Sequence, residues 1–190
     1  MIIREIKDRK ARRAIATKKI QPEIVQRLLS AASLAPSCNN NQPWRFVAVE
    51  DESNLSVVKE NLSRGNYWAK TAPLILLVVT KTDLDCTLSG QRDYAYFDSG
   101  MAVGNILLQA THEGLVAHPI AGFSPVEIKE AVGIPAGYTL LALIIVGYPG
   151  DESLLSEKHL KSEHQERKRK PEEQIVCFNS WGFEEPPVGS

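Results

Sequence analysis

Two kinds of hydrophobic pattern run along the chain, one with helical spacing and one in short continuous stretches. After Pro22, apolar residues recur three and four positions apart. This spacing predicts a helix with one buried face that ends before Pro36. The apolar positions of this face are Ile24, Val25, Leu28, Leu29 and Ala32. A second, longer helix is predicted from Asp93 to Glu113, with Gly114 at its end.

Four apolar stretches predict strands, over residues 44–49, 73–80, 116–118 and 139–147. The stretch from Pro73 to Thr80 is almost continuously apolar. We therefore expect it at the centre of a sheet, covered on both faces. None of these stretches is long enough to cross a bilayer, so no membrane partner is expected.

Weaker patterns add three short helices. One is predicted over residues 2–9 and another around 55–62. A third begins at Ser124, because Ser124 and Glu127 have the spacing of a capping box and Pro125 suits the first helical position. On the long helix, Gly100 and Gly104 lie one turn apart, which predicts tight packing in the core.

The C-terminal part differs from the rest. Residues 151–170 are highly charged, and the tail after Pro171 again carries large apolar side chains. These are Ile175, Val176, Phe178, Trp181 and Phe183. Since little core is left to cover them, the tail is expected to pack on a partner subunit. Together the elements predict an α+β fold, a sheet sandwiched by helices in a single domain over residues 1–190.

Charge and cysteine content limit the function. The 22 basic and 23 acidic residues give a formal net charge of −1, which argues against a nucleic-acid partner. The N-terminus becomes charged at once, so no secretory signal is expected and the protein is predicted to be cytoplasmic. Three cysteines without a close pair argue against a disulfide framework. The four histidines lack the spacing of metal ligands, so no metal is expected.

Four segments are candidates for binding or chemistry. Arg12 and Arg13 suit a phosphate, although alone they read better as a solvated charge cluster. Residues 36–44 hold three asparagines and a glutamine between prolines, more than a polar turn needs, and their amides suit the edge of a polar heterocycle. The other two are residues 118–123, which can present a backbone N–H to a ligand, and the charge run 167–171.

The familiar catalytic groups are missing. The sequence has no serine elbow, no convincing cysteine–histidine pair and no dinucleotide-binding GxGxxG motif after a strand. Its paired glutamates are adjacent and so point in different directions. A cofactor would therefore have to carry the chemistry, while the protein binds and orients it.

In their order along the chain, these segments resemble the nitroreductase superfamily of FMN enzymes. The most specific part is Ala35-Pro36-Ser37 followed by residues 40–46, Asn-Asn-Gln-Pro-Trp-Arg-Phe. Supporting parts are Ala72-Pro73, Asp98-x-Gly100, Gly114-Leu115, residues 119–123 and Arg169-Lys170-Pro171. The resemblance implies a three-layer α/β/α sandwich with a mostly antiparallel sheet. It also implies a homodimer with exchanged C-terminal arms.

The resemblance also implies site residues. Arg12, Arg13 and Ala14 fall where the family holds the FMN phosphate, and Arg167 and Arg169 fall where a C-terminal basic residue joins it. The loop that the partner subunit supplies to the flavin corresponds to Pro36, Ser37, Asn39 and Gln42. Asn66 corresponds to a contact at the polar edge of the ring. The loop across one flavin face corresponds to Pro119, Ile120, Ala121 and Gly122, with the Ala121 N–H near the reactive nitrogen.

One part of the motif departs from the family pattern. Ala14 and Ala16 stand where the family usually has a serine and a second basic residue. Two phosphate contacts are therefore missing, each worth about 1.5–3 kcal/mol. Weaker FMN binding is expected unless Lys18, Arg167 or Lys168 replaces them.

The leading hypothesis is ping-pong transfer of hydride from NADH or NADPH, through FMN, to an electron-poor small molecule such as a nitroaromatic or a quinone. A second hypothesis is a flavin-binding or redox-sensing module without turnover. A third is other flavin chemistry on the same fold, such as reductive dehalogenation or flavin breakdown. Nucleic-acid binding through residues 167–170 is a distant fourth.

Overall fold

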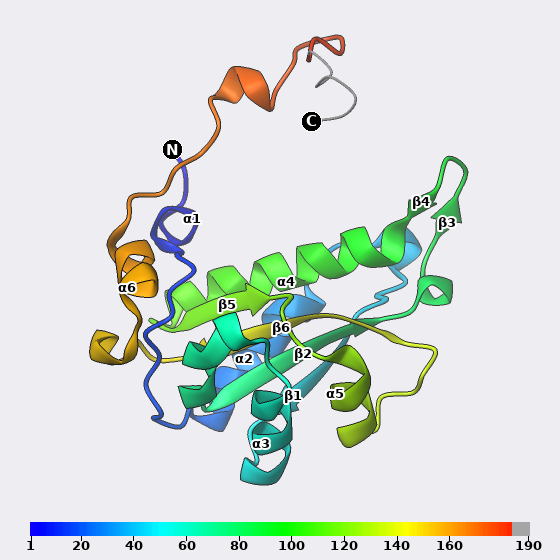
Figure 1. The fold of residues 1–190 in the computed structure, drawn as a ribbon. Helices are drawn as coiled ribbons and strands as arrows, with labels where there is room; N and C mark the ends of the chain where they lie inside the picture. The colour runs from blue at the N-terminus through cyan, green and yellow to red at the C-terminus, as the bar shows by residue number, and fades with distance from the viewer. Residues whose placement is uncertain (184–190) are drawn as a thin grey trace.

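The protein is described by a computed structural model of residues 1–183. A four-stranded sheet lies between two layers of helices (Figure 1). Its strands are β1 (Arg45–Val49), β2 (Leu74–Thr80), β6 (Thr139–Gly147) and β5 (Val116–Ile120), in that spatial order and all antiparallel. The helices are α1 (Arg4–Asp8), α2 (Pro22–Ser33), α3 (Glu52–Glu60), α4 (Tyr94–His112), α5 (Pro125–Ala131) and α6 (Glu157–His164).

Short elements connect these parts. A small hairpin, β3 (Thr87–Leu88) with β4 (Arg92–Asp93), precedes α4 and was not predicted. Five 3₁₀ segments are η1 (Cys38–Asn40), η2 (Arg64–Thr71), η3 (Thr82–Leu84), η4 (Glu152–Leu154) and η5 (Glu172–Gln174).

Strand β2 is the centre of the sheet, as its apolar run predicts. Every residue of β2 is buried. Leu77 pairs with Val47 of β1 on one side and with Leu143 of β6 on the other. The antiparallel sheet between two helical layers confirms the predicted α+β class.

Each face of the sheet has its own core. On one face, α2 and α4 pack through residues such as Leu28 and Ile106 against Leu76. On the opposite face, α3 and α5 pack through Val58 and Ile128. The periodic apolar positions of residues 22–32 and the length of α4 explain why these helices are predicted well.

Strand β5 is longer than predicted because it continues through Pro119 to Ile120. Proline lacks the N–H that a central strand needs on both sides, but β5 lies at the edge of the sheet. Pro119 therefore remains in the strand and carries the chain toward residues 120–123.

Two local predictions are wrong. Ser124 begins α5 but its side chain makes no capping hydrogen bond. Gly100 and Gly104 do not pack in the core: a Cβ built on either would meet nothing within 4 Å. These glycines open the outer side of α4, beside Phe97, which is 63% exposed.

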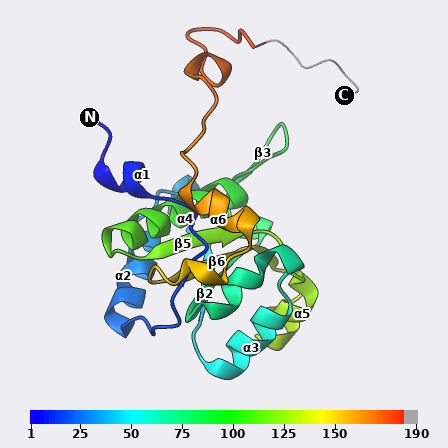
Figure 2. The ribbon, with the colours of Figure 1, turned by 60° about the vertical axis from the view of Figure 1, so that its left-hand side comes forward.

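The charged stretch after β6 forms an unpredicted helix, α6, capped by Ser156, whose side chain accepts a hydrogen bond from the N–H of His159. Beyond α6 the chain leaves the body and extends past α1 (Figures 1 and 2). Phe178 and Trp181 of this segment are about four-fifths exposed. The predicted arm also includes residues 184–190, which lie outside the described part. None of the helices in residues 1–183 combines the length and apolarity needed to span a bilayer.

Candidate functional site

A cleft of about 260 Å³ lies between the N-terminal segment and the stretch that follows α6. Residues 9–13 form one side, and Ser162, Glu163 and residues 165–169 form the other. The two predicted basic segments, 157 residues apart between Arg12 and Arg169, therefore meet here as the phosphate hypothesis requires.

Glu163 organises the arginine side of this cleft. Its side chain is fully buried, and one carboxylate oxygen accepts a hydrogen bond from Arg12 Nε at 3.1 Å. The other accepts from the backbone N–H of Arg13 at 2.9 Å. Glu152 accepts from a second nitrogen of Arg12 at 3.3 Å. The Arg12 guanidinium is thus held in place, and part of its charge is already compensated.

Positive charge remains in excess at the other end of the cleft. Burial lowers the pKa of Arg9, and the positive charges of Arg167 and Arg169 lower it further. Arg167 donates to the carbonyl oxygens of Ile6 at 3.1 Å and Lys7 at 3.0 Å, and also to that of Arg9. Arg167 therefore ties the N-terminal segment to the C-terminal one. Crowded cations of this kind favour a bound anion.

His118 supports the cleft from the sheet. Its Nδ1 lies 2.8 Å from the carbonyl oxygen of Arg12, and its ring packs on Trp68 with centroids 4.7 Å apart. The guanidinium of Arg13 lies over the Trp68 ring, 6.0 Å from its centroid. Burial lowers the pKa of His118, and the nearby Arg13 charge adds to this, so the imidazole is neutral at pH 7.

Asn66 lies directly against the predicted flavin loop. Its side-chain nitrogen donates to the Gly122 carbonyl at 2.9 Å, and the N–H of Ser63 donates to the same oxygen at 3.0 Å. A Cβ on Gly122 would come within 2.8 Å of Asn66 Nδ2. Only glycine leaves room for this contact, which joins two segments that the sequence treats separately.

Residues 36–44, called here the amide-rich loop, form a second structure that is separate from the basic cleft. Asn39, Asn40 and Gln42 have φ values of 50°, 58° and 51°, in the left-handed region. The hydroxyl of Ser37 accepts from the N–H of Gln42 at 2.9 Å, and the side chain of Gln42 donates to the Asn40 carbonyl at 3.0 Å. The loop thus presents exposed amides on a strained backbone, a feature typical of functional sites.

The two structures lie at opposite ends of α4. Asp98, near its start, accepts from the N–H of Cys38 at 2.7 Å, whereas His112, at its end, contacts Glu5 of α1 at 3.0 Å. At 1.5 Å per residue, these positions are about 21 Å apart along the helix. One chain therefore does not bring the amide-rich loop to the basic cleft.

A disulfide joins Cys38 to Cys86, which corrects the prediction drawn from cysteine spacing. The two cysteines are 48 residues apart in sequence, but their Cα atoms lie 6.1 Å apart. The fold brings them together by placing the segment after β2 beside the loop. Cys177 is free.

Some of the remaining predicted site residues line the cleft, and others do not. Arg13 and Arg169 line the cleft, whereas Ala14 is buried and does not. The backbone of Ala121 lies at an exposed position beside Gly122. Glu163 was not singled out from the sequence, because a glutamate in a charged stretch carries no signal of burial.

Comparison with known proteins identifies the chain. A model described as the nitroreductase family matches residues 6–148. The chain belongs to the nitroreductase family. Its fold is therefore the nitroreductase fold. A crystal structure described as that of an oxidoreductase containing FMN is 29% identical to this chain, with a TM-score of 0.85. The superposition covers 97% of this chain and 94% of the chain in that structure.

The names of similar proteins refer to different reactions. A protein named NADH dehydrogenase from Thermus thermophilus is 26% identical over 167 residues, which are 71% of this chain and 80% of its own. A 5,6-dimethylbenzimidazole synthase from Rhodospirillum rubrum is 29% identical over 165 residues, 73% and 77% of the two chains. Membership in the nitroreductase family therefore supports an oxidoreductase without fixing its substrate.

Proposed function

We propose that this protein is an FMN-dependent oxidoreductase that takes hydride from NADH or NADPH and reduces an electron-poor acceptor, such as a quinone or a nitroaromatic. The observation that carries the proposal is the basic cleft, where Arg9, Arg167 and Arg169 crowd their charges beside Arg13. An FMN phosphate is an anion that such a cleft suits. FMN would supply the hydride chemistry in both half-reactions.

In this proposal, residues of the chain bind and orient the FMN. Arg13 and Arg169 would hold the phosphate, with Arg12 and His118 positioning the segment that carries Arg13. Asn66 holds Gly122, and the neighbouring N–H of Ala121 would address the reactive ring nitrogen of the flavin. Ala14 faces the interior, so the family's missing hydroxyl is not replaced at that position, and modest FMN affinity is expected.

We also propose a homodimer, because the amide-rich loop of one chain does not lie near its own cleft. A partner would supply Pro36, Ser37, Asn39 and Gln42 to complete the site. Support comes from the open glycines of α4 beside Phe97 and from the exposed apolar tail. These surfaces are the kind that a tight dimer covers. Location in the cytoplasm, expected from the sequence, stays a prediction.

The test is an anaerobic spectrum of purified protein with FMN, before and after addition of NADH or NADPH. The proposal expects loss of the flavin absorbance and its return when a quinone is added. Flavin that binds but is never reduced by either nucleotide would contradict it. Reduction without turnover on any quinone, nitro compound or halogenated phenol would instead favour the redox-sensing module. Sedimentation of the same sample distinguishes a dimer from a monomer.

A further inference from the structure

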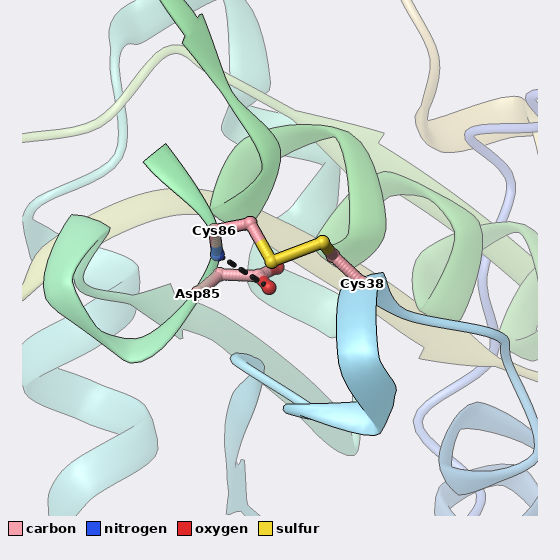
Figure 3. A group of neighbouring side chains, drawn as sticks. All are labelled: Cys38, Asp85 and Cys86. Carbon is pink, nitrogen blue, oxygen red and sulfur yellow. Dashed lines mark hydrogen bonds between the residues drawn. A yellow bond between two sulfur atoms is a disulfide. The ribbon is translucent and has the colours of Figure 1, made fainter. Parts of the chain in front are cut away.

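The Cys38–Cys86 disulfide lies at the base of the amide-rich loop (Figure 3). Cys38 belongs to η1, and Cys86 lies between η3 and the hairpin β3–β4. Both residues are only partly buried, and residues 39–42 are exposed. A reagent in solution can therefore approach this bond, unlike a bridge inside the core. Exposed disulfides exchange more readily than buried structural ones.

Polar groups surround the two sulfurs unequally. The side-chain amides of Asn39 and Asn41 point donors at Cys86 Sγ, at 3.5 and 3.6 Å. Donors of this kind stabilise a thiolate, so they favour Cys86 as the sulfur that leaves when the bond breaks. Attack is then directed to Cys38.

A carboxyl pair lies beside the bond. The Oδ1 of Asp85 accepts from the N–H of Cys86 at 2.8 Å, but its Oδ2 is buried and meets no donor in the described chain. Asp98 binds the N–H of Cys38, and burial, followed by the nearby Asp85, raises the pKa of Asp98. The raised pKa favours the protonated form of Asp98 beside Asp85.

We propose that Cys38 and Cys86 form a thiol–disulfide exchange site for a dithiol reductant, small-molecule or protein, and that its oxidised state clamps the amide-rich loop. A thiolate of the reductant attacks Cys38 Sγ, the S–S bond breaks, and Cys86 leaves as the thiolate. The second thiol of the reductant then attacks the mixed disulfide and frees Cys38. Two electrons pass from the dithiol, which becomes a disulfide, and its two protons end on Cys38 and Cys86.

The disulfide holds a loop whose backbone conformation is unfavourable for most residues. Three residues of the loop occupy left-handed φ values that non-glycine residues avoid. After reduction, hydrogen bonds such as that from Asn41 Nδ2 to Asp85, at 3.1 Å, would hold the loop alone. We expect faster amide exchange in residues 38–42 in the reduced protein. Any effect on FMN binding rests on the proposed function, whereas the exchange reaction does not.

The experiment is thiol trapping with mass spectrometry after equilibration in glutathione buffers of graded ratio. In wild type we expect only Cys177 to be labelled in the most oxidising buffer and all three cysteines in excess dithiothreitol, reversibly. Reduction should lower Tm by about 5 to 15 °C, because the bridge closes a long loop. Cys177→Ser should behave like wild type. Cys86→Ser, or Cys86→Ala if the serine variant folds poorly, should lose the redox dependence of Tm.

Two results would overturn the proposal. In one, Cys38 and Cys86 are labelled as free thiols in every buffer, including the most oxidising. In the other, the bridge persists in the folded protein in excess dithiothreitol, which makes it a permanent link. To separate small-molecule from protein reductants, the rate of opening is compared with dithiothreitol and with a dithiol protein at equal thiol concentration. No readout requires flavin, so failure of the proposed function would leave this test intact.

Discussion

The basic cleft and the amide-rich loop are built in opposite ways. The cleft is defined by charge: buried Glu163 fixes Arg12 and the backbone of Arg13, and cations crowd the other end. The loop is defined by backbone: left-handed residues and a disulfide hold amides at the surface. Each lies at its own end of α4. The difference teaches that, under the proposed function, binding of the phosphate and shaping of the ring pocket would fail separately.

The largest effect is expected at Glu163, whose carboxylate holds Arg12 and the backbone of Arg13. Glu163→Gln removes the buried charge that holds Arg12 and keeps a side chain of the same size. We expect a loss of about 2–3 kcal/mol of unfolding free energy, below the range for a fully buried pair because Arg12 is partly exposed. Urea unfolding measures it. Glu166→Gln, an exposed position of the same cleft, is the control, and equal stability of the two variants would contradict the role of Glu163.

The next effect separates binding from folding. Arg169→Ala removes a cation from the cleft without leaving a buried group unpaired. We expect FMN to bind about 10- to 100-fold more weakly, with unfolding free energy unchanged within about 0.5 kcal/mol. Titration of FMN at several salt concentrations measures this. Arg27→Ala, which removes an arginine of α2 that pairs with Glu113, should leave FMN affinity unchanged. Equal loss in both variants would mean that net charge, not the cleft, binds FMN.

A smaller effect is expected at the junction with the flavin loop. Gly122→Ala places a Cβ within 2.8 Å of Asn66 Nδ2, so the loop or Asn66 must shift. We expect a loss of about 1–2 kcal/mol in stability and a fall in kcat with FMN still bound. Adding Asn66→Ala removes the clash and should recover part of the stability, as a double-mutant cycle would show. Gly137→Ala, where the Cβ meets only the end of the Lys81 side chain at 3.6 Å, is the control for glycine removal in the same chain.

The smallest effect is a pH dependence from His118. Its folded-state pKa lies below the usual 6.5, chiefly through burial, so the unfolded chain binds the proton first as pH falls. The stability from neutral His118 is therefore complete above pH 6.5 and declines as pH drops through the folded pKa. Comparison of wild type with His118→Phe between pH 8 and pH 5 measures the difference. If the two lose stability in parallel, His118 is not the titrating group.

Elements with a regular pattern of apolar residues could be predicted from the sequence. The apolar face of α2 and the unbroken run of β2 depend on neighbouring residues, so their positions could be predicted. The meeting of the two basic segments could be predicted too, because arginines at both ends of the chain would suit one anion. Contacts between distant segments were not: Glu163 with Arg12, and Cys38 with Cys86, arise only once the sheet places them. The hairpin β3–β4 and α6 lacked an apolar face and so gave no hydrophobic signal.

Gly100 and Gly104 were expected to pack in the core, because two small residues one turn apart let another backbone approach closely. In the structure their side of α4 is open. The sequence could not distinguish a neighbour within the chain from a second copy, because both need the same small residues.

The central claim is that each FMN site combines the cleft of one chain with the amide-rich loop of another, and subunit mixing tests it most directly. Arg13→Ala/Arg169→Ala disables the cleft, and Ser37→Ala/Asn39→Ala disables the loop. After the two variants are unfolded and refolded together, half of the dimers are mixed and each mixed dimer holds one intact site. We predict FMN binding and NADH oxidation at about one quarter of the wild-type level, while each variant alone is nearly inactive. A mixture no more active than its separate components would contradict the claim.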